Sequence, residues 1–307
     1  MSEGDAGSLV SVVIPCHDHG RFLREAVESV QRQTLPGIEI VVVDDGSTDE
    51  TASVLAGLTG IHVIRQDCRG LSAARNRGWQ ASRGRYLVFL DADDRLPPTA
   101  LEIGVAHARA HPEAAFVSGH HALIDATGAH TGTGSMTCVT EDHYRALLRS
   151  NYIGMHATVV YRRETLDRFG DFDPSLRACE DYDLFLRVAR QAPIVCHPDL
   201  VAEYRRHGAN MSRNRGLMLR SALTVLRRQR RHVRGRPADE QAYRDGVRFW
   251  RHLFGDPLLD EVPRAVAARE WGRTARALIV LAREHPWGLA RRALSVARRL
   301  GRRALGR

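Results

Sequence analysis

Short apolar runs of strand type alternate with amphipathic segments from the start of the chain to Asp94. The predicted strands are Val10 to Pro15, Ile38 to Val43, Ile61 to Arg65 and Arg85 to Leu90. The predicted helices between them are Phe22 to Val30, Asp49 to Ala56 with Ser47 as its cap, and Ser72 to Ala81 with Ser72 as its cap. Such alternation is typical of a mostly parallel sheet with helices on its faces. Ligands of these α/β folds collect at the carboxyl ends of the strands.

The pattern changes after Asp94. A helix is predicted near Pro98 to His111, and it is followed by the shorter strands Ala114 to Ser118, Ala157 to Tyr161, Ile194 to His197 and Val201 to Tyr204. These features indicate a mixed rather than a strictly parallel sheet. Beyond Ser212 only helical patterns remain, so we expect two regions, an α/β domain over residues 1–212 and a helical region over residues 213–307.

Charge divides the chain at the same place. The net charge of the 307 residues is +9, but residues 1–212 carry −7 and residues 213–307 carry +16, all of the positive charge being arginine. The helical region therefore differs from the α/β domain in the sign and the size of its net charge. The use of arginine alone does not by itself indicate phosphate binding.

The sequence has no pattern typical of a membrane-spanning or secreted protein, and its cysteines do not form a known motif. No run of about 18 apolar residues occurs, and the first seven residues are acidic and small rather than basic and then apolar. We therefore expect a cytoplasmic protein. The five cysteines are scattered without a Cys-x-x-Cys pair, so the sequence indicates neither a disulfide framework nor a zinc site.

An acidic cluster follows the fourth predicted strand. If the strand continues through it, Asp91 and Asp93 project from one face while Ala92 points away. Hard cations such as Mg²⁺ and Mn²⁺ take oxygen ligands, and Mg²⁺ is usually held by carboxylates together with substrate phosphates. The cluster thus indicates a metal-bridged phosphate compound. The alternative is a solvated acidic turn that caps the next helix.

Four segments occur in order: Val10-Ser-Val-Val-Ile-Pro15, Val41-Val-Val-Asp44-Asp45-Gly-Ser-Thr48-Asp49, Gly70-Leu-Ser-Ala-Ala-Arg75-Asn76-Arg-Gly78 and Leu90-Asp91-Ala-Asp93-Asp94. Together they resemble the family-2 glycosyltransferases of GT-A fold. The resemblance extends from about Val10 to Ser212 and implies a Rossmann-like mixed sheet that binds a nucleotide-diphosphate sugar.

The resemblance implies roles for residues on the nucleotide side. Pro15 and His17 would line the nucleobase pocket, and Asp45 would accept a hydrogen bond from the base. An ionised carboxylate is an acceptor, as the imide N–H of uracil requires. Arg75 would lie near the nucleotide, where a helix N-terminus also favours anions. Ordinary alternatives remain, namely a helix-capping turn at Asp45, a loop histidine at His17 and an exposed helical arginine at Arg75.

The resemblance also implies the metal ligands and the base. Asp91 would bind the ribose or assist the metal, Asp93 would bind Mn²⁺ or Mg²⁺, and His207 would complete the metal shell or touch the diphosphate. Asp181, in the acidic first turn of a predicted helix, would be the general base that takes the proton of the acceptor hydroxyl. Stabilisation of the helix start is the alternative role for Asp181, and an arginine-rich surface loop is the alternative setting for His207.

Three residues have weaker assignments. Asp94 is expected to be structural because it lies on the other face of the strand. Gly154 and His156 fall where the family has a flexible loop near the acceptor.

The resulting hypothesis is a metal-dependent, inverting, hexosyltransferase-type enzyme. It would move a sugar from a nucleotide-diphosphate donor, most simply a UDP-sugar, to a carbohydrate, lipid-linked or other hydroxyl acceptor in cell-envelope, polysaccharide or glycoconjugate biosynthesis. The alternative class is a non-enzymatic polyanion-binding protein with a basic tail. No aromatic-interleaved basic motif is present, so nucleic acid is not an expected partner.

The tail has an amphipathic pattern. A helix from Pro286 would place six arginines on one arc opposite an alanine-rich apolar stripe; they are Arg291, Arg292, Arg298, Arg299, Arg302 and Arg303. Such a helix suits the inner face of an anionic membrane. The alternative is that the stripe packs on the helix containing Trp271, Leu278 and Ile279 while the arginines are solvated.

Overall fold

The computed structural model describes residues 9–134 and 137–305, with side chains described as far as residue 295. The described residues form two compact units. The first consists of the described residues within Met1–Leu147 and Asn151–Gly208, and the second of those within Leu148–Ser150 and Ala209–Arg307. Each unit is described separately below.

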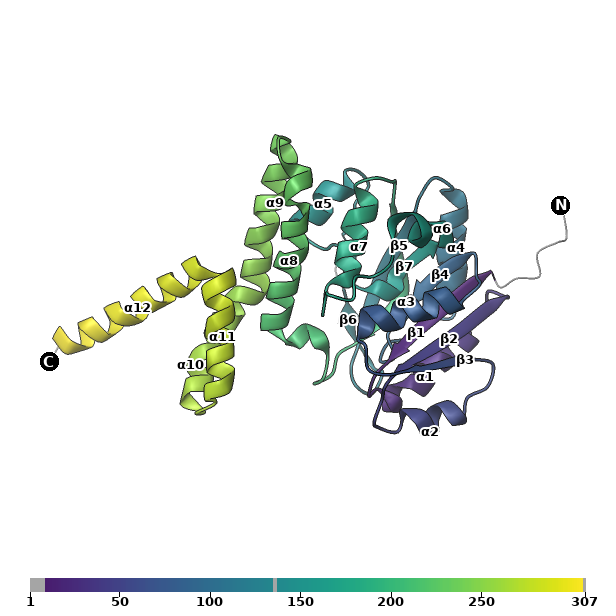
Figure 1. The fold of residues 1–307 in the computed structure, drawn as a ribbon, viewed down its shortest axis with the longest axis horizontal. Coiled ribbons are helices and arrows are strands. Elements are labelled where there is room, and N and C mark those ends of the chain that lie inside the picture. Colours follow the sequence, from purple (N-terminus) through teal and green to yellow (C-terminus); the bar gives the residue numbers. More distant parts are fainter. Residues whose placement is uncertain (1–8, 135–136, 306–307) are drawn as a thin grey trace. The chain divides into compact units, whose positions relative to one another are not determined.

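The described part of the first unit contains one eight-stranded sheet in the order β3-β2-β1-β4-β7-β5-β6, with β8 paired to β5 (Figure 1). The strands are β1 Val10–Cys16, β2 Ile38–Asp45, β3 His62–Gln66, β4 Tyr86–Phe89, β5 Phe116–Ile124, β6 His130–Thr133, β7 Val159–Arg162 and β8 Val195–Arg205. The first four run parallel, whereas β7 is antiparallel to both β4 and β5. The predicted mixed α/β sheet is confirmed.

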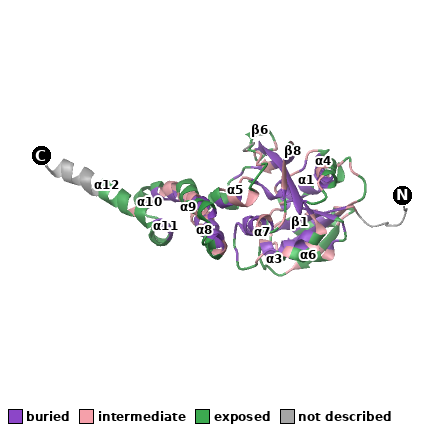
Figure 2. Cartoon of the chain, turned by 90° about the horizontal axis from the view of Figure 1, so that it is seen from above, coloured by how far each residue is buried: buried purple, intermediate pink, exposed green. Residues whose placement is uncertain are grey.

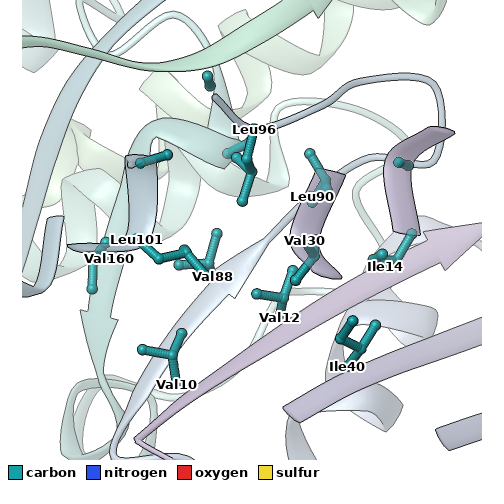
Figure 3. Close-up of a cluster of buried hydrophobic side chains, with 14 of the residues drawn as sticks. Val10, Val12, Ile14, Val30, Ile40, Val88, Leu90, Leu96, Leu101 and Val160 are labelled. Atoms are coloured by element: carbon teal, nitrogen blue, oxygen red, sulfur yellow. The ribbon is translucent and has the colours of Figure 1, made fainter. Parts of the chain in front are cut away.

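Helices lie on both faces of this sheet. They are α1 Gly20–Gln31, α2 Thr51–Ala56, α3 Leu71–Ala81, α4 Ala100–Ala110, α5 His143–Arg149, α6 Arg163–Phe169 and α7 Glu180–Ala189. On one face, Val12 and Ile14 of β1 are fully buried with Val30 of α1 and Leu101 of α4 (Figure 3). Burial of each such side chain contributes about 1.5–3 kcal/mol.

On the other face, α3 lies directly against β1 and β2. A Cβ added to Gly78 would come within 2.3 Å of Cγ1 of Val13. Val13 points to this face because side chains alternate along a strand. Glycine at this position therefore allows the close approach that holds the start of α3, which carries Arg75, beside the strand ends.

The acidic cluster forms a turn and not a strand. β4 ends at Phe89, and the amide of Asp94 donates to the carbonyl of Asp91 at 3.0 Å. The expectation that Asp91 and Asp93 project from one face of a strand is wrong, because the chain leaves the ladder before the first carboxylate. Turn geometry aims the carboxylates at different partners.

Both predicted serine caps are also wrong. The hydroxyl of Ser47 accepts the amide of Asp18 at 3.0 Å, and α2 begins only at Thr51. Gly70, with φ of +91°, precedes α3, so Ser72 lies inside the first turn. At Ser47, a long-range hydrogen bond thus takes the place of local capping. At the start of α3, Gly70 has a positive φ that residues with a side chain rarely adopt.

Three further elements differ from the sequence pattern. The two predicted strands near residues 194 and 204 are one continuous strand, β8. The exposed strand β6 has no apolar alternation, so its sequence carried no strand signal. The seven-residue helices α5 and α6 are too short for a clear helical period.

The described part of the second unit is helical. Its longer elements are α8 Arg215–Val233, α9 Pro237–Trp250, α10 Asp256–Ala267, α11 Trp271–Glu284 and α12 Pro286–Leu305, with a π-helical turn, Arg251–Gly255, between α9 and α10. A Cβ on Gly246 of α9 would lie 1.9 Å from the carbonyl oxygen of Leu148. This close approach explains why residues 148–150 belong to the second unit.

Exposed residues are frequent along α11 and the described part of α12 (Figure 2), and some of them are apolar. Trp271, Ile279 and Trp287 are 64%, 68% and 78% exposed. The alternative in which α12 covers Trp271 and Ile279 is therefore not what the structure shows. The side chains of Arg298, Arg299, Arg302 and Arg303 lie outside the described residues. Within the described residues, no helix has the length and apolar character needed to span a membrane.

Candidate active site

Asp45 lies at the carboxyl end of β2, and its side chain is buried. Its Oδ1 accepts the side-chain amide of Gln66 at 2.7 Å and the backbone N–H of Arg69 at 2.8 Å. Its Oδ2 accepts the N–H of Gly70 at 2.8 Å. Because a carboxylate has about four acceptor positions, Oδ2 retains one for a ligand. Asp45 thus organises the loop that leads into α3 and still offers an acceptor.

His17 and Pro15 lie beside Asp45 but differ in exposure. Nδ1 of His17 is 2.9 Å from the carbonyl oxygen of Asp45, and the imidazole is 48% exposed. Pro15 is buried within β1, opposite Val43 of β2. His17 is therefore the one of the two that presents a ring at the surface.

Arg75 joins the acidic turn to the start of α7. Its guanidinium is buried, and it donates to Oδ1 of Asp91 at 2.7 Å and to the carboxylate of Glu180. Burial alone would lower the pKa of Arg75, but Asp91 and Glu180 outweigh it and raise the pKa, so the guanidinium stays charged. Arg75 is not an exposed helical arginine, because two carboxylates from distant segments enclose it.

Asp181 lies next to this buried pair in the first turn of α7. Burial and, next, the charge of Glu180 raise the pKa of Asp181, Arg75 opposes both effects, and the net result is a pKa of about 7. Its Oδ1 accepts the N–H of Tyr182 at 2.7 Å. A carboxyl group that titrates near neutral pH is suited to exchange a proton with a substrate.

Asp93 faces two imidazoles from separate parts of the chain. Its Oδ2 lies 2.8 Å from Nε2 of His207 and 4.0 Å from Nε2 of His19. The ligand atoms of all three residues lie within 4.8 Å of one another. His207 is largely buried, with its ring 4.9 Å from that of Phe22. His207 is thus part of a packed cluster and is not an exposed loop histidine.

The donor set of this cluster fits a divalent cation. One carboxylate and two imidazoles suit Mn²⁺ better than Mg²⁺, because Mg²⁺ takes almost only oxygen ligands whereas first-row metal ions such as Mn²⁺ also bind nitrogen. The backbone around Asp93 is fixed, because Nε of the buried Arg205 donates to the Asp93 carbonyl at 2.7 Å. Asp91 is not part of this set, since its carboxylate is turned to Arg75.

Asp94 is fully buried and accepts the N–H of Arg205 at 2.7 Å. The burial of Asp94, together with the nearby charges of Asp93 and Asp91, raises its pKa well above the ordinary value. It connects the acidic turn to the end of β8.

His156 lies among aromatic side chains. Its ring stacks on Phe89 at 5.1 Å between centroids, and its Nε2 is 2.9 Å from the hydroxyl of Tyr161. Burial, and then the charge of Arg75, hold the pKa of His156 well below its usual range. His156 is 4% exposed whereas Gly154 is exposed, so of the two only Gly154 lies at the surface.

Two site residues were not predicted from the sequence. His19 follows the first strand in the segment His17-Asp18-His19, and only its approach to Asp93 marks it. Glu180 precedes the predicted base, and its burial against Arg75 marks it. The sequence signal that could have identified them is their position, just after β1 for His19 and at the start of α7 for Glu180.

Comparisons with known proteins agree with this geometry. The family model described as Glycosyl transferase family 2 matches residues 11–170, more than half of the chain. The chain belongs to glycosyl transferase family 2 and has the GT-A fold. It is accordingly a glycosyltransferase, and the polyanion-binding alternative is set aside.

One relative is an uncharacterized glycosyltransferase of Rickettsia prowazekii, 29% identical over 222 residues, covering 68% of this chain and 67% of the relative. The chondroitin synthase of Escherichia coli is 29% identical over 213 residues, covering 66% of this chain but only 30% of that enzyme. S. aureus TarS 1-349, solved in complex with UDP-GlcNAc, has a TM-score of 0.58 at 17% identity and covers 86% of this chain and 89% of that chain. The TarS likeness concerns the fold.

Proposed function

We propose that this glycosyltransferase moves a sugar, with inversion, from a UDP-sugar to a hydroxyl acceptor in polysaccharide or glycoconjugate biosynthesis, and that it depends on a divalent metal. The observation that carries the proposal is the contact of Arg75 with both Asp91 and Glu180. Through this contact, the acidic turn that follows β4 is tied to the helix start that carries Asp181. The UDP-GlcNAc in the TarS complex and the name of chondroitin synthase support the choice of donor and product class.

Asp181 is the proposed general base. Inversion requires a single base, because the acceptor hydroxyl loses its proton while it attacks the anomeric carbon opposite the leaving diphosphate. With a pKa of about 7, Asp181 is substantially ionised at neutral pH and still basic enough to hold that proton. Glu180 is paired with Arg75, so Asp181 is the carboxylate of the two that we assign as the base.

The donor side is assigned to the strand ends. The free acceptor position of Asp45 would bind the imide N–H of uracil, and the exposed ring of His17 would stack on the base. Pro15, buried in β1, would support this pocket from below without exposing its ring. Asp91, partly exposed and oriented by Arg75, would accept a ribose hydroxyl.

Asp93, His207 and His19 are the proposed metal ligands. A bound Mn²⁺ would supply positive charge for the diphosphate leaving group. The three side chains would hold the position of that charge.

A thermal-shift panel of nucleotide sugars, measured with and without Mn²⁺, tests the donor and the metal together. A ligand that binds only the folded state stabilises it by about 2.7 kcal/mol at 100 times its dissociation constant. We expect a UDP-sugar to raise Tm more with Mn²⁺ than without it. An equal response to every nucleotide, or none, would contradict the assignment.

The second unit is the proposed contact with an anionic membrane. The exposed Trp271, Ile279 and Trp287 provide apolar anchors, and Arg291 and Arg292 of α12 are exposed. Exposed aromatic and basic side chains are the composition of helices that lie in the headgroup region. A lipid-linked acceptor at the inner face of the membrane would be consistent with this contact.

A further inference from the structure

A second cluster of metal-ligating side chains lies in the first unit, outside the candidate active site. It consists of His120 on β5, Cys196 on β8 and Cys138 in the segment between β6 and α5. The imidazole nitrogen and the two sulfur atoms lie within 4.8 Å of one another. The three residues come from separate segments, and only the fold brings them together.

The sheet fixes two of the three positions. β5 and β8 pair in parallel with Ser118 opposite Cys196, and His120 follows Ser118 by two residues on the same strand. His120 is buried, and burial together with Cys138 raises the pKa of the Cys196 thiol to about 12. Both cysteines are partly buried, and both thiols are free in the structure.

The distances suit a small tetrahedral ion. With metal–sulfur bonds of about 2.3 Å and metal–nitrogen bonds of about 2.0 Å, tetrahedral ligand atoms stand roughly 3.5–3.8 Å apart. The three ligand atoms lie within 4.8 Å of one another, so closure around the ion requires shifts of at most about 1 Å. Thiolate and imidazole ligands favour Zn²⁺ over the Mn²⁺ or Mg²⁺ expected at Asp93.

We propose that His120, Cys138 and Cys196 bind Zn²⁺ and so fasten the segment after β6 to the β5–β8 edge of the sheet. Both thiols give up their protons to solvent as the metal–sulfur bonds form, and no electron is transferred. Three protein ligands leave the fourth tetrahedral position to a water molecule.

The test uses the 307-residue protein, freed of metal with a chelator and kept reduced. Titration with Co²⁺ should produce thiolate-to-cobalt charge-transfer absorption that saturates at one equivalent, and Zn²⁺ should abolish it. A Co²⁺ ion at Asp93 cannot produce this absorption, because the ligands there are oxygen and nitrogen. One equivalent of Zn²⁺ should also release two protons and protect two of the five thiols from alkylation.

Variants separate this site from other thiols. Cys138→Ser and Cys196→Ser should each remove most of the absorption, and His120→Asn should weaken Zn²⁺ binding by at least roughly tenfold. Cys68→Ser is the matched control, because Cys68 is exposed and lies near His17 and Asp45 instead. No saturable absorption in the unmodified protein, or absorption that survives in Cys138→Ser and disappears in Cys68→Ser, would overturn the proposal. Thiols that Zn²⁺ leaves fully reactive would also overturn it, whatever the variants do.

Discussion

The guanidinium of Arg75 and the carboxylate of Glu180 form a buried ion pair although 105 residues separate them in the sequence. Arg75 also contacts Asp91 with its other terminal nitrogen. A planar guanidinium presents several donors in fixed directions, so it can hold two carboxylates in one arrangement where a lysine would not. The pair therefore sets the position of the helix start that carries Asp181.

Breaking this pair should cost more stability than breaking an exposed one. Arg75→Met leaves Glu180 buried without a counter-charge, and we expect the free energy of unfolding to fall by about 3–5 kcal/mol. Arg32→Met is the control, because Arg32 and Glu28 are 59% and 41% exposed in their pair, and the change should cost under about 1 kcal/mol. Urea unfolding of both variants measures the difference. Equal losses would show that the buried pair has no special role.

Replacing the proposed base should stop transfer but spare donor binding. We expect Asp181→Asn to lower the rate of sugar transfer by about 10²–10⁴-fold, because the amide cannot accept the hydroxyl proton. The change in Tm with donor and Mn²⁺ should persist. Asp171→Asn, at an exposed position shortly before α7, should leave the rate unchanged. A fully active Asp181→Asn enzyme would refute the assignment.

The pH dependence should report the raised pKa of Asp181. Transfer should rise with pH through about 7, since the carboxyl group acts as a base only when ionised. The folded protein binds this proton more tightly than the unfolded chain does, so the group lowers stability as pH increases from 3.8 to about 7. Asp181→Asn should remove that loss and be at least as stable as the original protein at pH 8. A rate profile that falls only below pH 5 would contradict this prediction.

Both imidazoles beside Asp93 should contribute to metal affinity. We expect His207→Ala and His19→Ala each to weaken Mn²⁺ binding by at least roughly tenfold, measured by loss of the free Mn²⁺ electron paramagnetic resonance signal. His130→Ala is the control, because His130 is 63% exposed and pairs with Glu203. Unchanged binding in His19→Ala would reduce the ligand set to Asp93 and His207.

The proposed membrane contact should depend on α12 and on lipid charge. Removal of residues 286–307 should reduce sedimentation with anionic vesicles, because each basic residue near such a surface contributes about 1 kcal/mol. In the intact protein, Trp287→Ala should reduce sedimentation more than Arg283→Ala does, because Trp287 is 78% exposed and apolar, whereas Arg283 is exposed and polar. Neutral vesicles should bind weakly in every case. Equal sedimentation of the full and shortened proteins with anionic vesicles would eliminate this contact.

The sequence by itself determined the order of the strands and helices from β1 to α4, because apolar periodicity is a local property that does not depend on tertiary contacts. It also located Asp45 at the end of β2 and Asp181 in an acidic helix start, since both follow directly from the element boundaries. The resemblance to family-2 glycosyltransferases, now confirmed, rested on the same local segments.

Only the tertiary structure decided which side chains meet. The Asp91–Asp94 segment is a turn whose Asp94 accepts the N–H of Arg205 across 111 residues, a contact that strand alternation cannot reveal. The same holds for His19 beside Asp93, for Glu180 beside Arg75, and for the two thiols beside His120. These contacts join residues that are distant in sequence. Their geometry depends on how helices and loops pack on the sheet, and the local sequence pattern therefore does not predict them.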